Sequence, residues 1–299
     1  MNDESVMSAN PTLAAPDVAR DDFPPRVFSF TDEDFSFLRK LITAHTSIQV
    51  TEMKREMVYG RVSRRLRQLG LTSFSEYCKL LQDKQANELG NLINAITTNL
   101  TSFFRENHHF EYLERAALPI ISQTNVSQRR IRIWSAGCST GEEAYSIAMA
   151  AQQAGCLIPG WDLKILATDI DTNVLEKAKL GVYPLADIER LPVALRRRAF
   201  LKGQNGHAAQ AKVRDEIRNL VTFLPLNLIE AWPMHGPFDA IFCRNVVIYF
   251  DRATQMSLFD RFAEILAPGG FLFIGHSETL FGISSRFELI GQTIYRKRA

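Results

Sequence analysis

The sequence predicts an α/β fold with a doubly wound sheet, and three observations support this prediction. Residues 131–134 form a short apolar run that favours a β-strand, followed by a turn with two glycines and a helical pattern from Glu142. A second apolar run, 163–168, ends in acidic residues, and a third, 238–243, ends in polar ones. Strand, glycine turn and helix form the first unit of a nucleotide-binding sheet, whose ligand lies beyond the carboxyl ends of the strands.

The glycine turn itself narrows the kind of ligand. Gly137 and Gly141 are spaced GxxxG, which is not the GxGxxG fingerprint of dinucleotide-binding proteins. Glu142 and Glu143 then begin the helix, and a helix N-terminus that receives a phosphate rarely carries two further negative charges. A ligand with hydroxyl groups and a positive charge fits this turn better than a phosphate.

The composition is that of an ordinary globular protein. The length of 299 residues predicts about two domains, and the net charge of +2 gives no reason to expect nucleic-acid binding or a membrane surface. No apolar run approaches the roughly 18 residues of a membrane span, and the polar N-terminus is not a signal peptide. The four cysteines of the chain include no C-x-x-C pair, which predicts a reduced, cytoplasmic protein without disulfides or a metal site. We also expect a monomer.

The N-terminal third predicts a disordered tail, residues 1–25, and a helical domain, 26–98. Thr31 and Asp34 form a capping signal for the first helix. A second helix runs from about Thr51 to Gly70, and two more are expected at 74–82 and 86–97. One face of the second helix is basic, which fits either a solvated surface or a docking surface for an acidic partner. The candidate docking residues on this face are Lys54, Arg61, Arg64 and Arg65.

A linker and connecting helix, residues 99–130, lead into the α/β domain, 131–299. Asn99 and Thr101 belong to a stretch that interrupts the helical pattern, and a new helix is expected at 108–121. The linker also contains two adjacent phenylalanines before Arg105, more aromatic surface than a simple turn requires. Its side chains are therefore expected to reach the ligand crevice of the sheet.

Two acids follow the second strand, and each has an expected role. Asp169 stands where nucleotide-binding α/β folds accept hydrogen bonds from ribose hydroxyls, whereas Asp171 is placed to cap the next helix, 173–180. The strand at 238–243 carries Arg244 and Asn245 at its carboxyl end, on the same ligand-binding edge. A helix at 252–266, a turn at 268–270 and strands at 271–275 and 292–296 are expected to complete the sheet.

Between these strands, residues of about 183–224 do not fit the alternation of strand and helix. They include a short helix with a basic end, a polar glycine loop at 202–207, and two β-like runs at 211–213 and 220–224. We interpret this stretch as an inserted β-subdomain with a hairpin.

Four motifs, taken in order, resemble the CheR family of S-adenosylmethionine-dependent methyltransferases. They are AITTNLTSFFRE at 95–106, STGEE at 139–143, DID at 169–171 and FCRNVVIYF at 242–250. The resemblance extends from about Phe30 to the C-terminus. It implies a Rossmann-like methyltransferase fold and transfer of methyl groups from S-adenosylmethionine to glutamate side chains on chemoreceptor cytoplasmic helices. The products would be glutamyl methyl esters and S-adenosylhomocysteine, in bacterial chemotaxis adaptation.

The resemblance also implies roles for individual residues. Tyr249 would orient the substrate glutamate, and Arg105 would position substrate and contact the cofactor. The implied cofactor site consists of Asn99, Thr101, Arg105, Glu143, Asp169, Asn227, Leu228, Arg244 and Asn245. The insertion matches an element with which some members bind a receptor's C-terminal pentapeptide. That loop typically reads Arg-Gly-x-Gly and here reads Lys-Gly-Gln-Asn, which makes Lys202, Gly203 and Lys212 the candidate contacts.

The chemistry explains why no histidine or cysteine stands out. A glutamate carboxylate has a reference pKa of about 4.3 and is already the nucleophile at neutral pH, so no general base is needed. His108 and His109 are accordingly expected on a helix surface. Two other functions remain as alternatives: a nucleic-acid methyltransferase, although the Pro-Pro and Pro-Cys motifs of such enzymes are missing from the α/β domain, and a signalling adaptor that retains the fold for receptor binding.

Overall fold

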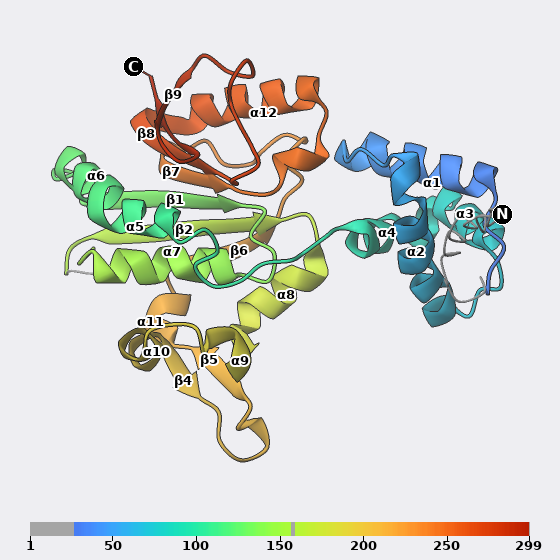
Figure 1. Cartoon of the computed structure of the whole chain (residues 1–299), viewed down its shortest axis with the longest axis horizontal. Helices are drawn as coiled ribbons and strands as arrows, with labels where there is room; N and C mark the ends of the chain where they lie inside the picture. The colour runs from blue at the N-terminus through green and yellow to red at the C-terminus, as the bar shows by residue number, and fades with distance from the viewer. Residues whose placement is uncertain (1–26, 157–158, 299) are drawn as a thin grey trace, which may run out of the picture.

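The computed structural model describes residues 27–156 and 159–298, which form a helical lobe and a larger α/β lobe joined by an extended linker (Figure 1). The predicted tail at 1–25 lies outside the described residues. Among the described residues, no helix is both long and apolar enough to cross a membrane.

Two helix ends in the helical lobe lie where local signals predicted, whereas the helix expected at 86–97 is the short η2 (Lys84–Ala86) followed by a separate helix, Leu89–Ile96. Thr31 caps the first helix in a capping box, in which Asp34 N donates to Thr31 Oγ1 at 3.1 Å and Thr31 N donates to Asp34 Oδ2 at 3.0 Å. Gly70 ends the second with a φ of 68°, a conformation that glycine adopts without strain. The helices are α1 (Asp32–Thr46), η1 (Glu52–Lys54), α2 (Arg55–Leu69), α3 (Phe74–Gln82), η2 (Lys84–Ala86) and α4 (Leu89–Ile96). Their apolar stripes meet in a separate core that includes Phe35, Leu38, Val58 and Leu66.

The linker has no regular structure between α4 and α5 (His108–Tyr112). The helix expected at 108–121 is in fact three consecutive segments, because a π-helical turn, Leu113–Ala117, separates α5 from α6 (Leu118–Thr124). Phe103 is buried against Tyr183 and Phe200 of the insertion, with ring centroids 4.9 and 5.3 Å apart. This aromatic contact anchors the linker to the α/β lobe.

A seven-stranded sheet organises the described part of the α/β lobe, in the order β6-β2-β1-β7-β8-β10-β9. The first five strands in this order are parallel, and β10 and β9 are antiparallel to their neighbours. The strands are β1 (Arg130–Ala136), β2 (Asp162–Asp169), β6 (Val221–Pro225), β7 (Phe238–Cys243), β8 (Leu266–Ile274), β9 (Phe287–Gly291) and β10 (Ile294–Lys297). The parallel strands place the residues that follow β1, β2 and β7 at one edge of the sheet.

Helices cover both faces of the sheet, as in a doubly wound fold (Figure 1). One core packs α5, α6, α7 (Glu142–Gln153) and α8 (Thr172–Leu180) around Ile133 and Ile165. The other core packs α12 (Arg252–Ile265) around Trp134 and Leu272. Helices α7 and α8 follow β1 and β2 directly, so their N-termini lie beside the carboxyl ends of those strands.

The inserted subdomain is smaller than predicted. It contains a three-stranded antiparallel sheet, β3-β5-β4, formed by β3 (Val182–Pro184), β4 (Phe200–Lys202) and β5 (Gln210–Val213), with the short helices α9 (Leu185–Ile188), α10 (Val193–Ala199), η4 (Asn205–His207) and α11 (Asp215–Arg218). The run at 220–224, expected in the insertion, instead forms β6 and pairs in parallel with β2, from Ile165–Val221 to Asp169–Pro225. The hairpin is therefore β4–β5. An alternating run does not specify which sheet it joins, and this is why the boundary was wrong.

The C-terminal region differs from the prediction in two places. The expected turn at 268–270 is part of β8, where Gly269 has a φ of 69° and the pairing register with β7 shifts. Strand β9 was not predicted; it pairs with β10, which covers most of the strand expected at 292–296.

Candidate active site

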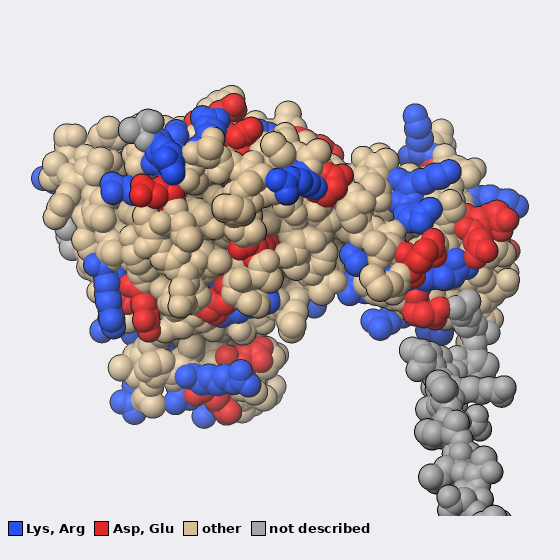
Figure 2. Space-filling view, turned by 45° about the horizontal axis from the view of Figure 1, so that its top comes forward, with Lys and Arg blue, Asp and Glu red and all other residues tan. Residues whose placement is uncertain are grey.

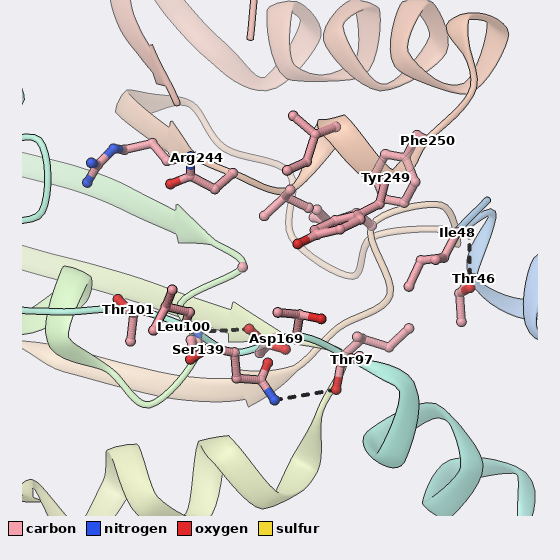
Figure 3. Close-up of a pocket in the computed structure, with 18 of the residues that line it drawn as sticks. Thr46, Ile48, Thr97, Leu100, Thr101, Ser139, Asp169, Arg244, Tyr249 and Phe250 are labelled. Atoms are coloured by element: carbon pink, nitrogen blue, oxygen red, sulfur yellow. Dashed lines mark hydrogen bonds between the residues drawn. The ribbon is translucent and has the colours of Figure 1, made fainter. Parts of the chain in front are cut away.

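A cavity of about 350 Å³ lies at the carboxyl edge of β1, β2 and β7, where the helical lobe meets the α/β lobe (Figure 3). Its volume is in the range of small-molecule sites. Each residue of the predicted cofactor site lines this cavity: Asn99, Thr101, Arg105, Glu143, Asp169, Asn227, Leu228, Arg244 and Asn245. Tyr249 lines it too, so residues from five separate stretches of the chain meet at one place.

The glycine turn after β1 approaches the end of β2 closely. Gly137, Ser139 and Gly141 all have positive φ values, of 92°, 50° and 97°. This path brings Ser139 N to 2.8 Å from Asp169 Oδ2, to which it donates, while Asp171 N donates to Asp169 Oδ1 at 3.0 Å. Burial nevertheless raises the pKa of Asp169 to about 6. Asp169 is thus a fixed, desolvated acceptor at the carboxyl end of β2.

Asp171 has the capping role predicted for it and a second role that was not predicted. Its Oδ1 accepts from Asn173 N at 2.9 Å and caps α8. Its Oδ2 accepts from Thr97 Oγ1 at 2.8 Å and from Asn99 Nδ2 at 2.7 Å. Asp171 therefore ties the start of the linker to the end of β2.

Glu143 and Arg244 form a buried ion pair in the wall of the cavity. Arg244 Nη1 donates to Glu143 Oε2 at 3.1 Å, and Ser135 Oγ donates to Glu143 Oε1 at 2.7 Å. Burial raises the pKa of Glu143, although Arg244 favours its charged form. Arg244 also donates to the carbonyl of Arg105 and lies 3.3 Å from Glu106 Oε2. Its guanidinium points away from Asp169 and Tyr249 in Figure 3, so it braces the linker against the sheet.

The network continues through Glu106, whose importance sequence reasoning missed. Glu106 Oε1 lies 3.0 Å from His276 Nδ1, and nearby Arg244 and His276 hold the pKa of Glu106 at about 2 despite partial burial. His109 is fully buried and not on a helix surface as expected; its Nε2 lies 3.0 Å from Thr293 Oγ1. Burial lowers the pKa of His109 to about 3.

The loop after β7 is held by a second carboxylate that the sequence did not single out. Glu278 is buried, and its Oε1 accepts from the N–H groups of Val246 and Val247 at 3.0 Å. Its Oε2 accepts from Asn245 N at 3.0 Å and also from Gly275 N. Asn245 itself has a φ of 58°. Glu278 thus fixes the turn from which Tyr249 reaches the cavity.

The helical lobe closes the cavity over Tyr249. Gln49 N donates to the carbonyl of Tyr249 at 2.8 Å, and Lys54 Nζ lies 5.4 Å from the centroid of the Tyr249 ring. In Figure 3 the Tyr249 hydroxyl points into the cavity, with Ile48 on the adjoining loop. Other lining residues from this lobe that sequence reasoning missed are Thr46, Val50 and Met57.

Two further predicted residues make contacts that place them at the cavity wall. Arg105 Nη1 donates to the carbonyl of Leu100 at 2.8 Å. Asn227 Nδ2 donates to the carbonyl of His45 at 2.7 Å, which is another contact between the lobes, and the neighbouring Leu228 is buried. The cavity is therefore bounded by both lobes and by the linker.

The candidate receptor contacts differ in their surroundings. On α2, Arg65 forms an ion pair with the buried Glu88 at 2.7 Å, and Arg61 is bonded to the linker, whereas Arg64 is exposed. In the insertion, Lys202 on β4 and Lys212 on β5 are exposed. Gly203 follows β4 where an added Cβ would meet the carbonyl oxygen of His207 at 2.0 Å, so the loop requires glycine there.

The donor set of the cavity fits the cofactor that the sequence resemblance implies. Asp169 is a buried acceptor of the kind that would suit ribose hydroxyls, and Arg105 is a cation of the kind that would suit the methionyl carboxylate. The apolar lining from Ile48, Leu228 and Val246 suits an adenine ring. No group of three or more potential metal ligands occurs in the described ranges.

Comparison with known proteins agrees with this geometry. The family model described as "CheR methyltransferase, SAM binding domain" matches residues 99–296, and "CheR methyltransferase, all-alpha domain" matches residues 33–97. The chain is 46% identical over 275 residues to chemotaxis protein methyltransferase 2 of Pseudomonas aeruginosa, covering 91% of this chain and 96% of that protein. It is 45% identical over 273 residues to the chemotaxis protein methyltransferase of Escherichia coli, covering 89% of this chain and 91% of that protein.

The boundary between the two family matches, at residues 97–99, coincides with the junction at which the helical lobe passes into the linker. The two family matches together therefore include both lobes and the linker between them. The chain belongs to the CheR family of S-adenosylmethionine-dependent methyltransferases.

Proposed function

We propose that this methyltransferase esterifies glutamate side chains on the cytoplasmic helices of chemoreceptors, with S-adenosylmethionine as methyl donor and S-adenosylhomocysteine as product. The relatives named as chemotaxis protein methyltransferases support the pathway. The observation that carries the chemical class is the composition of the cavity. Its described lining includes no cysteine and a single histidine, His276, whose Nδ1 is engaged by Glu106. A cavity of this kind suits a substrate that is already an anionic nucleophile.

The residues of the site would position the reactants and exclude water. Bound S-adenosylmethionine supplies a methyl group that is activated by its bond to a positively charged sulfonium sulfur, and this sulfur leaves as a neutral thioether. Asp169 would hold the ribose, and the Glu143–Arg244 pair would keep the linker in place. Tyr249 and Arg105 would align the glutamate oxygen with the methyl group, and alignment of this kind lowers a barrier by roughly 7–11 kcal/mol. A tight ion pair with Arg105 would weaken the nucleophile, so Arg105 serves best in positioning.

The inserted subdomain supplies a separate binding surface for a receptor. Strand β4 is an edge strand of its small sheet, and an apolar hollow of about 230 Å³ lies beside it. The hollow is lined by Leu185, Ile188, Val193, Arg196, Arg197, Phe200, Lys202 and Ala211. An acidic C-terminal peptide with aromatic residues would add to β4 as a strand, place an aromatic ring in the hollow and meet the basic side chains.

Transfer of a radiolabelled methyl group onto purified receptor signalling domains, followed by mild alkali, tests the main proposal. A glutamyl methyl ester releases its label as volatile methanol, and we expect nearly all of the transferred label to be alkali-labile. Label that resists alkali would show methylation of a different atom. Cofactor binding without any transfer to receptors would favour the signalling adaptor.

A further inference from the structure

Arg61 of α2 bonds to the linker and does not point outward into a basic docking face. Its Nη1 donates to the carbonyl of Thr97 at 2.6 Å and also to the carbonyl of Ile96, and its Nη2 donates to Thr98 Oγ1 at 3.0 Å. Arg64, one turn further along the same helix, is exposed. Two arginines that look equivalent in the sequence therefore have different surroundings.

The bonded carbonyls lie where a helix needs them satisfied. Helix α4 ends at Ile96, and Thr97 is already extended, with φ −65° and ψ 147°. The last carbonyls of a helix have no partner within the helix and favour a cation. The planar guanidinium of Arg61 supplies both the charge and the several donors that this turn requires, which a lysine would match only in charge.

The segment that Arg61 holds forms one wall of the cofactor cavity. Thr97 Oγ1 and Asn99 Nδ2 both donate to Asp171 Oδ2, and Ser139 Oγ donates to the carbonyl of Asn99 at 2.9 Å. Asp171 N in turn donates to Asp169 Oδ1. A continuous series of hydrogen bonds thus leads from Arg61 through residues 97–99 to the ribose acceptor Asp169.

We propose that Arg61 is a positioning residue for cofactor binding. From the helical lobe, Arg61 holds residues 97–99 in place. These residues in turn hold Asp171 through the side chains of Thr97 and Asn99. This role gives the helical lobe a part in binding S-adenosylmethionine, exerted through residues 97–99, in addition to any contact with a receptor. The proposal concerns the cofactor alone and stands whether or not receptor glutamates are the substrate.

Calorimetric titration with S-adenosylhomocysteine tests the proposal on four full-length proteins: wild type, Arg61→Ala, Arg61→Lys and Arg64→Ala. We expect Arg61→Ala to weaken binding by about tenfold, the size of one hydrogen bond to a charged group. Arg61→Lys keeps the positive charge but loses the several donors of the planar guanidinium, so its affinity for S-adenosylhomocysteine should lie between those of wild type and Arg61→Ala. Arg64→Ala removes the same charge from the same helix and should leave the cofactor affinity unchanged.

Steady-state kinetics separate this role from receptor docking. A positioning role raises the KM for S-adenosylmethionine and leaves the KM for the receptor fragment unchanged. Arg61→Ala with wild-type cofactor affinity and a raised receptor KM would overturn the proposal.

A second variant keeps the test decisive if Arg61→Ala does not fold. Thr97→Val removes the bond to Asp171 with little change in shape, and it should weaken S-adenosylhomocysteine binding. Combined with Arg61→Lys, it should add little further loss, because both act through the same segment. Wild-type affinity in Thr97→Val, or fully additive losses in the double variant, would contradict the series of contacts.

Discussion

The cofactor cavity and the inserted subdomain use charge in opposite ways. In the cavity, Asp169, Glu143 and Arg244 are buried, as is Glu278 behind the loop after β7, and each has hydrogen-bond partners within the protein. In the insertion, which projects from the lower side of the α/β lobe in Figure 1, the lysines of β4 and β5 are exposed. The view in Figure 2 likewise shows Lys and Arg side chains interspersed with Asp and Glu, without a single broad basic face.

The difference predicts how the two regions respond to change. A buried charge that loses its partners costs far more than an exposed one, because nothing replaces the water that it gave up. An exposed ion pair contributes little and is screened by salt. Substitutions in the cavity should therefore have large, pH-dependent effects on cofactor binding and catalysis, whereas substitutions in the insertion should affect only partner binding, weakly and with salt dependence.

The largest effect is expected at Asp169. Asp169→Ala removes a charged acceptor for the ribose hydroxyls, which costs roughly 1.5–3 kcal/mol, or about 10- to 150-fold in affinity for S-adenosylmethionine. Calorimetry measures the loss directly, and the melting temperature shows whether the variant is folded. Wild-type affinity in a folded Asp169→Ala protein would remove this residue from the binding site.

A smaller loss, in turnover more than in cofactor binding, is expected at Glu278. The amide of Glu278→Gln places an NH₂ group against backbone N–H donors, so about half of the present hydrogen bonds lose their acceptor. The loop that carries Tyr249 should loosen, and kcat should fall by roughly tenfold, with a lower melting temperature. Glu264→Gln, an exposed carboxylate on α12, is the matched control. An unchanged kcat in Glu278→Gln would show that the loop keeps its position without this carboxylate.

The pH dependence of cofactor binding should report the raised pKa of Asp169. Because this pKa is about 6, the carboxyl group is ionised at pH 8, and about a tenth of it is ionised at pH 5. The ionised form is the better acceptor, so the affinity for S-adenosylhomocysteine should fall by up to about tenfold between these pH values. Asp169→Asn should lose this step.

Stability must be followed in the same experiment, because Asp169 and His109 act on it in opposite directions. The folded protein holds a proton on Asp169 between pH 6 and 3.8 that the unfolded chain has lost, so this group favours folding as the pH falls. His109 acts in reverse: it stays neutral to about pH 3 in the folded state and charges near 6.5 when unfolded, so its contribution weakens the fold below pH 6.5. Asp169→Asn retains the His109 effect, so a binding step that persists in this variant would assign the pH dependence to another group.

Features set by neighbouring residues could be predicted from the sequence. The cap at Thr31, the helix stop at Gly70 and the cap at Asp171 each depend on side chains within a few residues, and all were confirmed. The glycine turn between β1 and α7 also follows from local pattern. The glycine turn after β1 and the cap at Asp171 after β2 located the edge of the sheet at which the cavity lies.

Features that depend on contacts between residues far apart in the sequence could not be predicted. Glu278 bonds to residues about 30 positions away, and Arg61 bonds to residues 35–37 positions away, so neither shows a signal in its own neighbourhood. The contact between Gln49 and Tyr249 joins the two lobes and brings the helical lobe into the cavity. Strand β6 was assigned to the wrong sheet for the same reason, since alternation reveals a strand but not its neighbour.

The smallest expected effect concerns the insertion, and it tests the exposed half of the comparison. Lys202→Glu/Lys212→Glu reverses two exposed charges beside the edge strand β4, which should weaken binding of an aromatic-flanked acidic pentapeptide by roughly 3- to 10-fold, more at low salt than at high salt. Lys79→Glu/Lys84→Glu makes the same change in net charge on the helical lobe and should bind the peptide like wild type. Methylation of a receptor fragment without this peptide should be equal in all three proteins, because the cavity is unchanged.

If wild type shows no binding at high micromolar peptide, or the Lys202→Glu/Lys212→Glu protein binds equally well, the insertion is not a tether. Receptor engagement would then depend on the helical lobe between Lys54 and Arg67, where Arg64 is exposed and Arg61 is bonded to the linker.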